Sequence, residues 1–96
     1  DENIIGFAIY IYGTELFLSA HYVSPSWQHH GYGSNLLSEG IHYFKDDYNE
    51  VYLEVDNKNE EAMTFYQQKG FEKVRSYTHV MYGEAMDLAL LRKPLK

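Results

Sequence analysis

A short run of polar and glycine residues between two apolar segments has the spacing of an anion-binding loop. Residues 28–33 read QHHGYG and follow a strand-like segment that Pro25 brings to an end. Gly31 and Gly33 flank one residue and let the backbone approach an anion closely. A helix that starts after them offers unpaired N–H groups and the positive end of its dipole. The loop therefore predicts a pyrophosphate site.

The glycine spacing alone does not identify a ligand. A tight strand-to-helix turn that binds nothing would use the same two glycines. A dinucleotide-binding fingerprint needs a third glycine where Leu36 stands, and a P-loop needs a Gly-Lys-Ser/Thr sequence that the chain lacks. His29 and His30 resemble metal ligands, but no third ligand is spaced to join them, so no metal site is expected. The turn and the anion loop both stay open at this point.

A second segment, residues 59–71, combines a helix stripe with groups suited to proton transfer. Ala62, Phe65 and Tyr66 share one face at positions i, i+3 and i+4. A buried helix stripe explains most of this pattern. It leaves unexplained a phenol near the end of a helix whose start is close to the strand carboxylate Glu54.

Seven elements in the order ββαβαββ must position these groups. Strands are expected at residues 4–11, 16–23, 51–55, 71–80 and 84–91, with a helix of about four turns after the loop and a second helix capped by Asn59. The nearly continuous apolar run at 4–11 predicts a strand covered on both faces. The first helix should bury a stripe formed by Leu36, Leu37, Ile41, Tyr43 and Phe44.

The composition limits the class of protein. The 96 residues make one domain at most, 1–96, and 45% hydrophobic content with ten tyrosines is that of a globular chain. A formal net charge of -6 argues against a surface for nucleic acid or an anionic membrane. The absence of cysteine excludes a disulfide framework and fits a cytoplasmic protein. No apolar run approaches the length of a membrane helix.

In this order, and with one strand between them, the two segments closely resemble the GNAT superfamily of N-acetyltransferases. The likeness covers nearly the whole chain, whose fold class would then be α/β with a GNAT-like mixed sheet. The loop with its preceding strand is similar to the acetyl-CoA pyrophosphate loop, through Val23-Ser24-Pro25 and Gln28-x-x-Gly31-x-Gly33. The later segment is similar to the second coenzyme-binding region, through Leu53-Glu54-Val55, Asn59, Ala62, Phe65-Tyr66 and Gly70-Phe71.

The resemblance implies how acetyl-CoA is held. The strand before the loop and the strand after the first helix would run parallel and splay apart, with pantetheine lying between them. Backbone groups of the first strand would bind pantetheine, namely those of His21, Tyr22 and Val23. The pyrophosphate would be held by the loop, at Gln28, His29, His30, Gly31, Tyr32, Gly33 and Ser34. Asn59 would contact the pantetheine arm.

The resemblance also implies a reaction and its catalytic groups. Tyr66 stands where the family has its general acid, and Glu54 where the ribosomal-protein alanine N-acetyltransferases have their general base. The expected enzyme moves acetyl from acetyl-CoA to a primary amine by direct attack in a ternary complex. A small amine, a polyamine or a peptide N-terminus could be the acceptor, because the closing hairpin resembles both alanine-directed and polyamine-directed relatives. The alternative is a noncatalytic coenzyme A-binding or dimerisation module.

One departure from the family is expected at the start of the chain. Family members begin with a strand, two helices and a further strand, and nearly all of this is lacking before residue 4. The first residue is not methionine, which indicates a piece of something longer. Either two copies complete each other's sheet as a homodimer, or the chain is part of a full enzyme.

Overall fold

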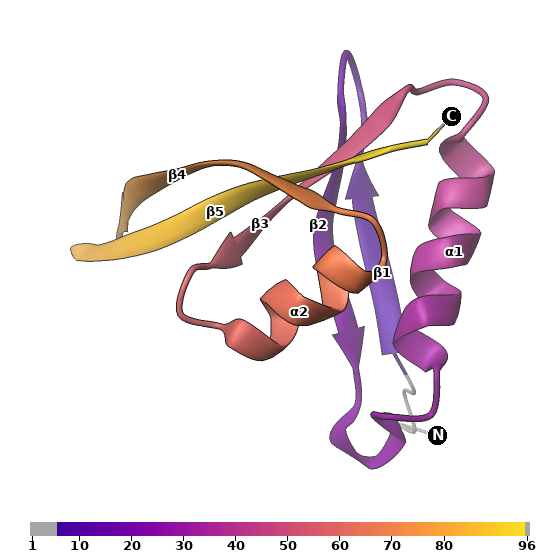
Figure 1. The fold of residues 1–96 in the computed structure, drawn as a ribbon, viewed down its shortest axis with the longest axis horizontal. Helices are drawn as coiled ribbons and strands as arrows, with labels where there is room; N and C mark the ends of the chain where they lie inside the picture. The colour runs from indigo at the N-terminus through magenta and orange to yellow at the C-terminus, as the bar shows by residue number, and fades with distance from the viewer. Residues whose placement is uncertain (1–5, 96) are drawn as a thin grey trace. The chain divides into compact units, whose positions relative to one another are not determined.

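The computed structural model describes residues 6–95, and its elements follow the predicted order ββαβαββ. The strands are β1 (Gly6–Ile11), β2 (Leu16–Val23), β3 (Glu50–Asp56), β4 (Glu72–Met81) and β5 (Glu84–Pro94). The helices are α1 (Tyr32–Phe44) and α2 (Glu60–Gln68), and a 3-10 turn, η1 (Pro25–Trp27), precedes α1. The strands form one sheet in the order β1-β2-β3-β5-β4 (Figure 1). The predicted strand residues Ile4 and Ile5 lie outside the described part.

The chain divides into two compact units, the first of which runs to Val51 and includes Leu95. In this unit β1 and β2 form an antiparallel hairpin, and a bulge interrupts their register between Ile9 and Tyr10. Figure 1 shows α1 lying along the hairpin. The buried side chains of the unit are Leu16, Leu18, Leu37 and Val51.

Strand β1 is covered on one face only, so the prediction of a strand buried on both faces is wrong. Its side chains alternate between half-buried and exposed, and the exposed ones are Phe7, Ile9 and Ile11. Because α1 packs on one face of the hairpin, the apolar residues that point the other way stay 42–58% exposed. This apolar segment therefore forms a strand that packs on one face only.

The predicted stripe on α1 is confirmed in part. Leu37 is buried, and Leu36, Ile41 and Phe44 are half-buried. Tyr43 is exposed instead, and its ring contacts that of Phe44 at 4.8 Å between centroids. The last turn of the helix therefore carries an aromatic surface.

The second unit, residues 52–94, is built on the antiparallel hairpin of β4 and β5. Tyr82 and Gly83 join the two strands, and both have positive φ angles, 53° and 78°, as in a type I′ turn. Its buried side chains are Leu53, Val55, Phe71, Leu88, Ala89 and Leu91. In the described residues of both units, no helix has the length and apolar character needed to cross a membrane.

Candidate functional site

The conformation of the loop between β2 and α1 is held by hydrogen bonds within the loop and back to β2. After Val23 the chain turns through η1, where the Trp27 N–H donates to the Ser24 carbonyl at 2.8 Å. The Gln28 side chain reaches back, and its Nε2 donates to the Val23 carbonyl at 3.0 Å. Gln28 therefore shapes the loop by binding a backbone group of the strand before it.

Two residues of the loop adopt left-handed backbone conformations. His29 has φ 67° and Gly31 has φ 85°. Gly31 is the N-cap of α1, and a Cβ atom built there would meet no atom within 4 Å. Glycine suits this position, because a side chain would be strained at this φ angle and would extend into the open space before the helix.

Helix α1 starts earlier than predicted, which moves Gly33 from the loop into the first helical turn. The first helical hydrogen bond runs from the Asn35 N–H to the Gly31 carbonyl at 3.0 Å. The N–H groups of the three residues before Asn35, residues 32–34, consequently have no helical acceptor. No side chain within the described residues caps this end.

This helix end is suited to an anion. Residues 24–35 contain no lysine or arginine, so attraction for a negative group comes mainly from backbone N–H groups and the helix dipole. The rings of Trp27 and Tyr32 meet edge to face at 5.7 Å, and His30 lies 6.3 Å from each of them. These aromatic contacts tie the loop to the first turn of α1.

His21 fastens the end of β2 to the same turn. Its Nε2 donates to the Gly33 carbonyl at 2.9 Å, which requires the proton on Nε2. Burial lowers the pKa of the His21 imidazole below its ordinary value, and the hydrogen bond to Gly33 offsets part of this effect. The pKa shift favours a neutral side chain that acts as a structural tie.

In the second unit, Glu54 has a partner that sequence reasoning missed. Val51, Leu53 and Val55 are buried, whereas Glu54 is exposed on the opposite face, as their alternation predicts. The Tyr77 hydroxyl of β4 donates a hydrogen bond to Glu54 Oε2. The Tyr82-Gly83 turn sets the pairing of Tyr77 with Leu88, but no sequence pattern aligns that hairpin with β3.

Asn59 caps α2 as predicted. Its Oδ1 accepts a hydrogen bond from the Ala62 N–H at 3.0 Å, and Glu60 and Glu61 follow in the first turn. The preceding turn is held by Asn57, whose Nδ2 donates to Asp87 Oδ1 on β5 at 2.9 Å. The start of α2 is therefore fixed to the closing hairpin.

Tyr66 is oriented by the motif that ends α2. Gly70 adopts φ 96°, and its N–H donates to the Gln67 carbonyl at 3.1 Å, while the Phe71 N–H donates to the Tyr66 carbonyl at 3.0 Å. These two bonds form a Schellman motif, so the prediction of Gly70 as the residue past the helix end is confirmed. The buried Phe71 ring packs against Tyr66 at 5.5 Å, which holds the phenol in place.

The predicted site residues thus fall into two groups. The first unit contains His21, Tyr22, Val23, Gln28, His29, His30, Gly31, Tyr32, Gly33 and Ser34. The second unit contains Glu54, Asn59 and Tyr66. Hydrogen bonds join His21 to Gly33 and Gln28 to Val23 within the first group. Across residues 6–95, no three or more histidine, aspartate and glutamate side chains gather as a set that could hold a metal ion.

Comparison with known proteins identifies the family. The sequence model of the acetyltransferase (GNAT) family matches residues 1–71. An N-alpha-acetyltransferase of Sulfolobus acidocaldarius is 37% identical over 67 residues, which are 68% of this chain and 39% of that protein. The matched part of the chain therefore covers well under half of the length of that relative.

Two solved structures share the fold. The ribosomal-protein-S18-alanine N-acetyltransferase from Escherichia coli has a TM-score of 0.85 at 23% identity, over 100% of this chain and 64% of that chain. A GNAT family acetyltransferase from Elizabethkingia anophelis, with acetyl-CoA bound, has a TM-score of 0.80 at 20% identity, over 98% of this chain and 71% of that chain. With this fold and the family match over residues 1–71, the chain belongs to the acetyltransferase (GNAT) family.

Proposed function

We propose that this chain binds acetyl-CoA at the loop before α1 and takes part in transferring the acetyl group to a primary amine. The observation that carries the proposal is the start of α1, where Gly31 leaves open space in front of unpaired N–H groups. A pyrophosphate fits this end because it needs close backbone approach and several donors. A family member of the same fold holds acetyl-CoA, which supports the choice of ligand.

Each part of the coenzyme has a proposed partner. The pyrophosphate is bound by the N–H groups of Tyr32, Gly33 and Ser34 together with the backbone of residues 28–31. Backbone groups at the end of β2, residues 21–23, bind the pantetheine arm, as does Asn59 in the second unit. The amide oxygen of Asn59 already caps α2, so its contribution to the coenzyme is the Nδ2 donor.

Acetyl-CoA supplies the activated acetyl group, and the side chains of this chain manage the protons. Glu54 removes a proton from the acceptor ammonium, directly or through a water, and Tyr77 positions the carboxylate by its hydrogen bond. Tyr66 donates its phenolic proton to the thiolate as the C–S bond breaks, and the phenolate takes up the second proton that the amine nitrogen loses once it is bonded to the acetyl group. The packing of Tyr66 on Phe71 reduces the entropy lost when the phenol is aligned.

For the acceptor, we favour the α-amine of a peptide N-terminus. The relative from Sulfolobus acidocaldarius is an N-alpha-acetyltransferase, and its 37% identity to this chain exceeds the 23% and 20% of the two solved structures. A net charge of -6 also favours a cationic partner. Thiol release from acetyl-CoA with a free peptide, and none with the same peptide blocked at its N-terminus, is the expected result.

The loop is tested by a glycine pair with matched backbones. Gly31 and Gly83 have φ angles of 85° and 78°, and a Cβ atom at either would meet nothing within 4 Å. Gly31→Ala and Gly83→Ala should therefore each lower the free energy of unfolding by about 1–2 kcal/mol. Only Gly31→Ala should weaken acetyl-CoA binding in calorimetry, by about tenfold or more. Equal coenzyme affinity in the two variants would show that the loop does not bind the coenzyme.

The general acid is tested by Tyr66→Phe, which keeps the ring packing on Phe71. Turnover on the peptide should fall about 10²-fold, while acetyl-CoA affinity stays within about twofold. Tyr82→Phe, at an exposed turn, is the control and should leave both unchanged. A wild-type turnover rate in Tyr66→Phe would exclude the phenol as the acid.

A second candidate function is a coenzyme-binding or dimerisation module without catalysis. The exposed apolar face of β1, formed by Phe7, Ile9 and Ile11, favours this candidate because such a face is normally covered by a partner. Normal acetyl-CoA binding without turnover above background would favour the noncatalytic module over the acetyltransferase.

A further inference from the structure

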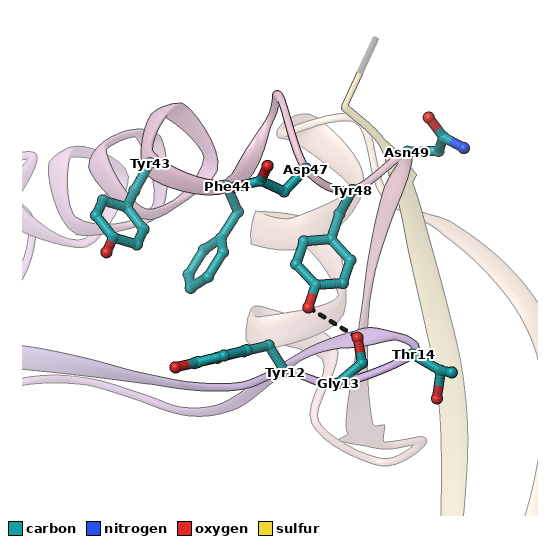
Figure 2. Close-up of a pocket in the computed structure, with 8 residues that line it drawn as sticks. All are labelled: Tyr12, Gly13, Thr14, Tyr43, Phe44, Asp47, Tyr48 and Asn49. Atoms are coloured by element: carbon teal, nitrogen blue, oxygen red, sulfur yellow. Dashed lines mark hydrogen bonds between the residues drawn. The ribbon is translucent and has the colours of Figure 1, made fainter.

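A surface hollow of about 470 Å³ lies at the end of the first unit where α1 finishes. Its walls come from the β1–β2 turn, from the last residues of α1 and from the link that leads to β3. Figure 2 shows Tyr43, Phe44 and Tyr48 extending toward the turn that carries Tyr12. The Tyr48 hydroxyl donates to the Gly13 carbonyl at 2.9 Å and closes one side.

Half of the residues that line the hollow are aromatic. Phe44 is the centre of the group, with centroid distances of 5.7 Å to Tyr12, 4.8 Å to Tyr43 and 5.9 Å to Tyr48. Tyr12 and Tyr43 remain 68% and 77% exposed. Because the rings of Tyr12 and Tyr43 stay accessible to solvent, they are available to a ligand.

The surroundings of the hollow are acidic. Asp47 is one of its lining residues, and its carboxylate makes no hydrogen bond or ion pair with the described residues. The segments that form the walls also carry Glu15, Asp46 and Glu50, against one lysine, Lys45. Aromatic faces beside a carboxylate attract a cation, through the ring quadrupole and by direct charge.

We propose that this hollow binds a small organic cation with an alkylammonium head, enclosed by the rings of Tyr12, Tyr43 and Phe44, with Asp47 adding negative charge at the wall of the hollow. The hollow and the coenzyme loop lie at opposite ends of α1, whose 13 residues span about 20 Å. The proposed cation site is therefore separate from the loop and does not depend on acetyl transfer.

The test titrates choline and its neutral isostere, 3,3-dimethylbutan-1-ol, into the ¹⁵N-labelled chain while amide shifts are recorded. Choline has no amine that can be acetylated at nitrogen, so the readout is independent of any transferase activity. Choline should give saturable shifts at the amides of Gly13, Asp47 and Tyr48, with a Kd of about 1–10 mM. The alcohol should bind at least about fivefold more weakly, because only the charge differs.

Two variants locate the site, and one serves as a control. Tyr43→Leu should weaken choline binding about tenfold, and Asp47→Asn about threefold, with the remaining amide spectrum unchanged as evidence of folding. Tyr82→Leu, which removes a fully exposed tyrosine from the other unit, should have no effect. Equal shifts with choline and the alcohol, no shifts at about 50 mM choline, or wild-type affinity in Tyr43→Leu would each overturn the proposal.

Discussion

His21 contributes to the dependence of the stability of the chain on pH. Its pKa is lowered from the ordinary 6.5, mainly by burial, so between that lowered pKa and about pH 6.5 His21 is protonated more fully in the unfolded chain than in the folded chain. The contribution of His21 to the free energy of unfolding is therefore complete above that pH and is lost as pH falls toward the lowered pKa. Thermal unfolding of wild type between pH 5 and 7.5 should show this loss.

The variant His21→Gln separates this effect from general acid sensitivity. It should flatten the dependence of the melting temperature on pH across the same window, because glutamine does not titrate there. His42→Gln, which replaces an exposed histidine on α1, should keep the wild-type slope. An unchanged slope in His21→Gln would show that other groups cause the dependence.

Residue roles could be predicted from the sequence where neighbouring positions determine them. The cap at Asn59 and the helix end at Gly70 depend on residues three or four positions away, so local patterns identify them. The Tyr77 bond to Glu54 joins positions 23 apart and depends on how β4 is placed, which no local pattern encodes. The assignments of residues 21–23, residues 28–34 and Asn59 to coenzyme binding, and of Glu54 and Tyr66 to catalysis, rest on family resemblance and stay predictions.

Among the secondary-structure elements, α1 contains a glycine that is explained by packing against the neighbouring strand β1. Gly40 is in the middle of the helix, where alanine would be favoured by about 1 kcal/mol. A Cβ atom there would overlap the Tyr10 ring, which packs on Phe44 at 5.4 Å. Gly40→Ala should therefore lower the free energy of unfolding by about 1–3 kcal/mol in urea.

A double-mutant cycle tests the cause of this loss. In the background of Tyr10→Leu, which removes the overlapping hydroxyl, Gly40→Ala should cost less than it does alone. Ser38→Ala, an exposed change on the same helix, should stay within about 0.5 kcal/mol of wild type. A stabilising effect of Gly40→Ala alone would mean that helix propensity outweighs the contact.

Element types and order could be predicted because each segment has its own periodicity and turn signals. The predicted boundaries of β2 match the observed ones at both ends, because Leu16 follows a glycine-containing turn and Pro25 stops the strand. The cover of β1 could not be predicted in the same way. An apolar run indicates what a strand would bury, but the rest of the molecule decides which face is covered.

For the molecule as a whole, the exposed face of β1 predicts self-association. Phe7, Ile9 and Ile11 point outward from the strand at one end of the sheet order, and Ile9 is 50% exposed. A second copy that covers this face would remove apolar surface from water at about 25 cal/mol per Å². Light scattering after size exclusion should give about twice the chain mass of 11.3 kDa.

Ile9→Lys should convert the dimer to a species near 11.3 kDa without unfolding it, because the replaced side chain is half exposed in the single chain. The matched control is Val80→Lys, on β4 at the other end of the sheet order, where the valine is 66% exposed. That variant should remain dimeric, since an exposed aliphatic residue by itself does not create an interface. A folded wild type that stays at 11.3 kDa at all concentrations would contradict association through β1. If Ile9→Lys and Val80→Lys were both monomeric, the interface could not be assigned to β1.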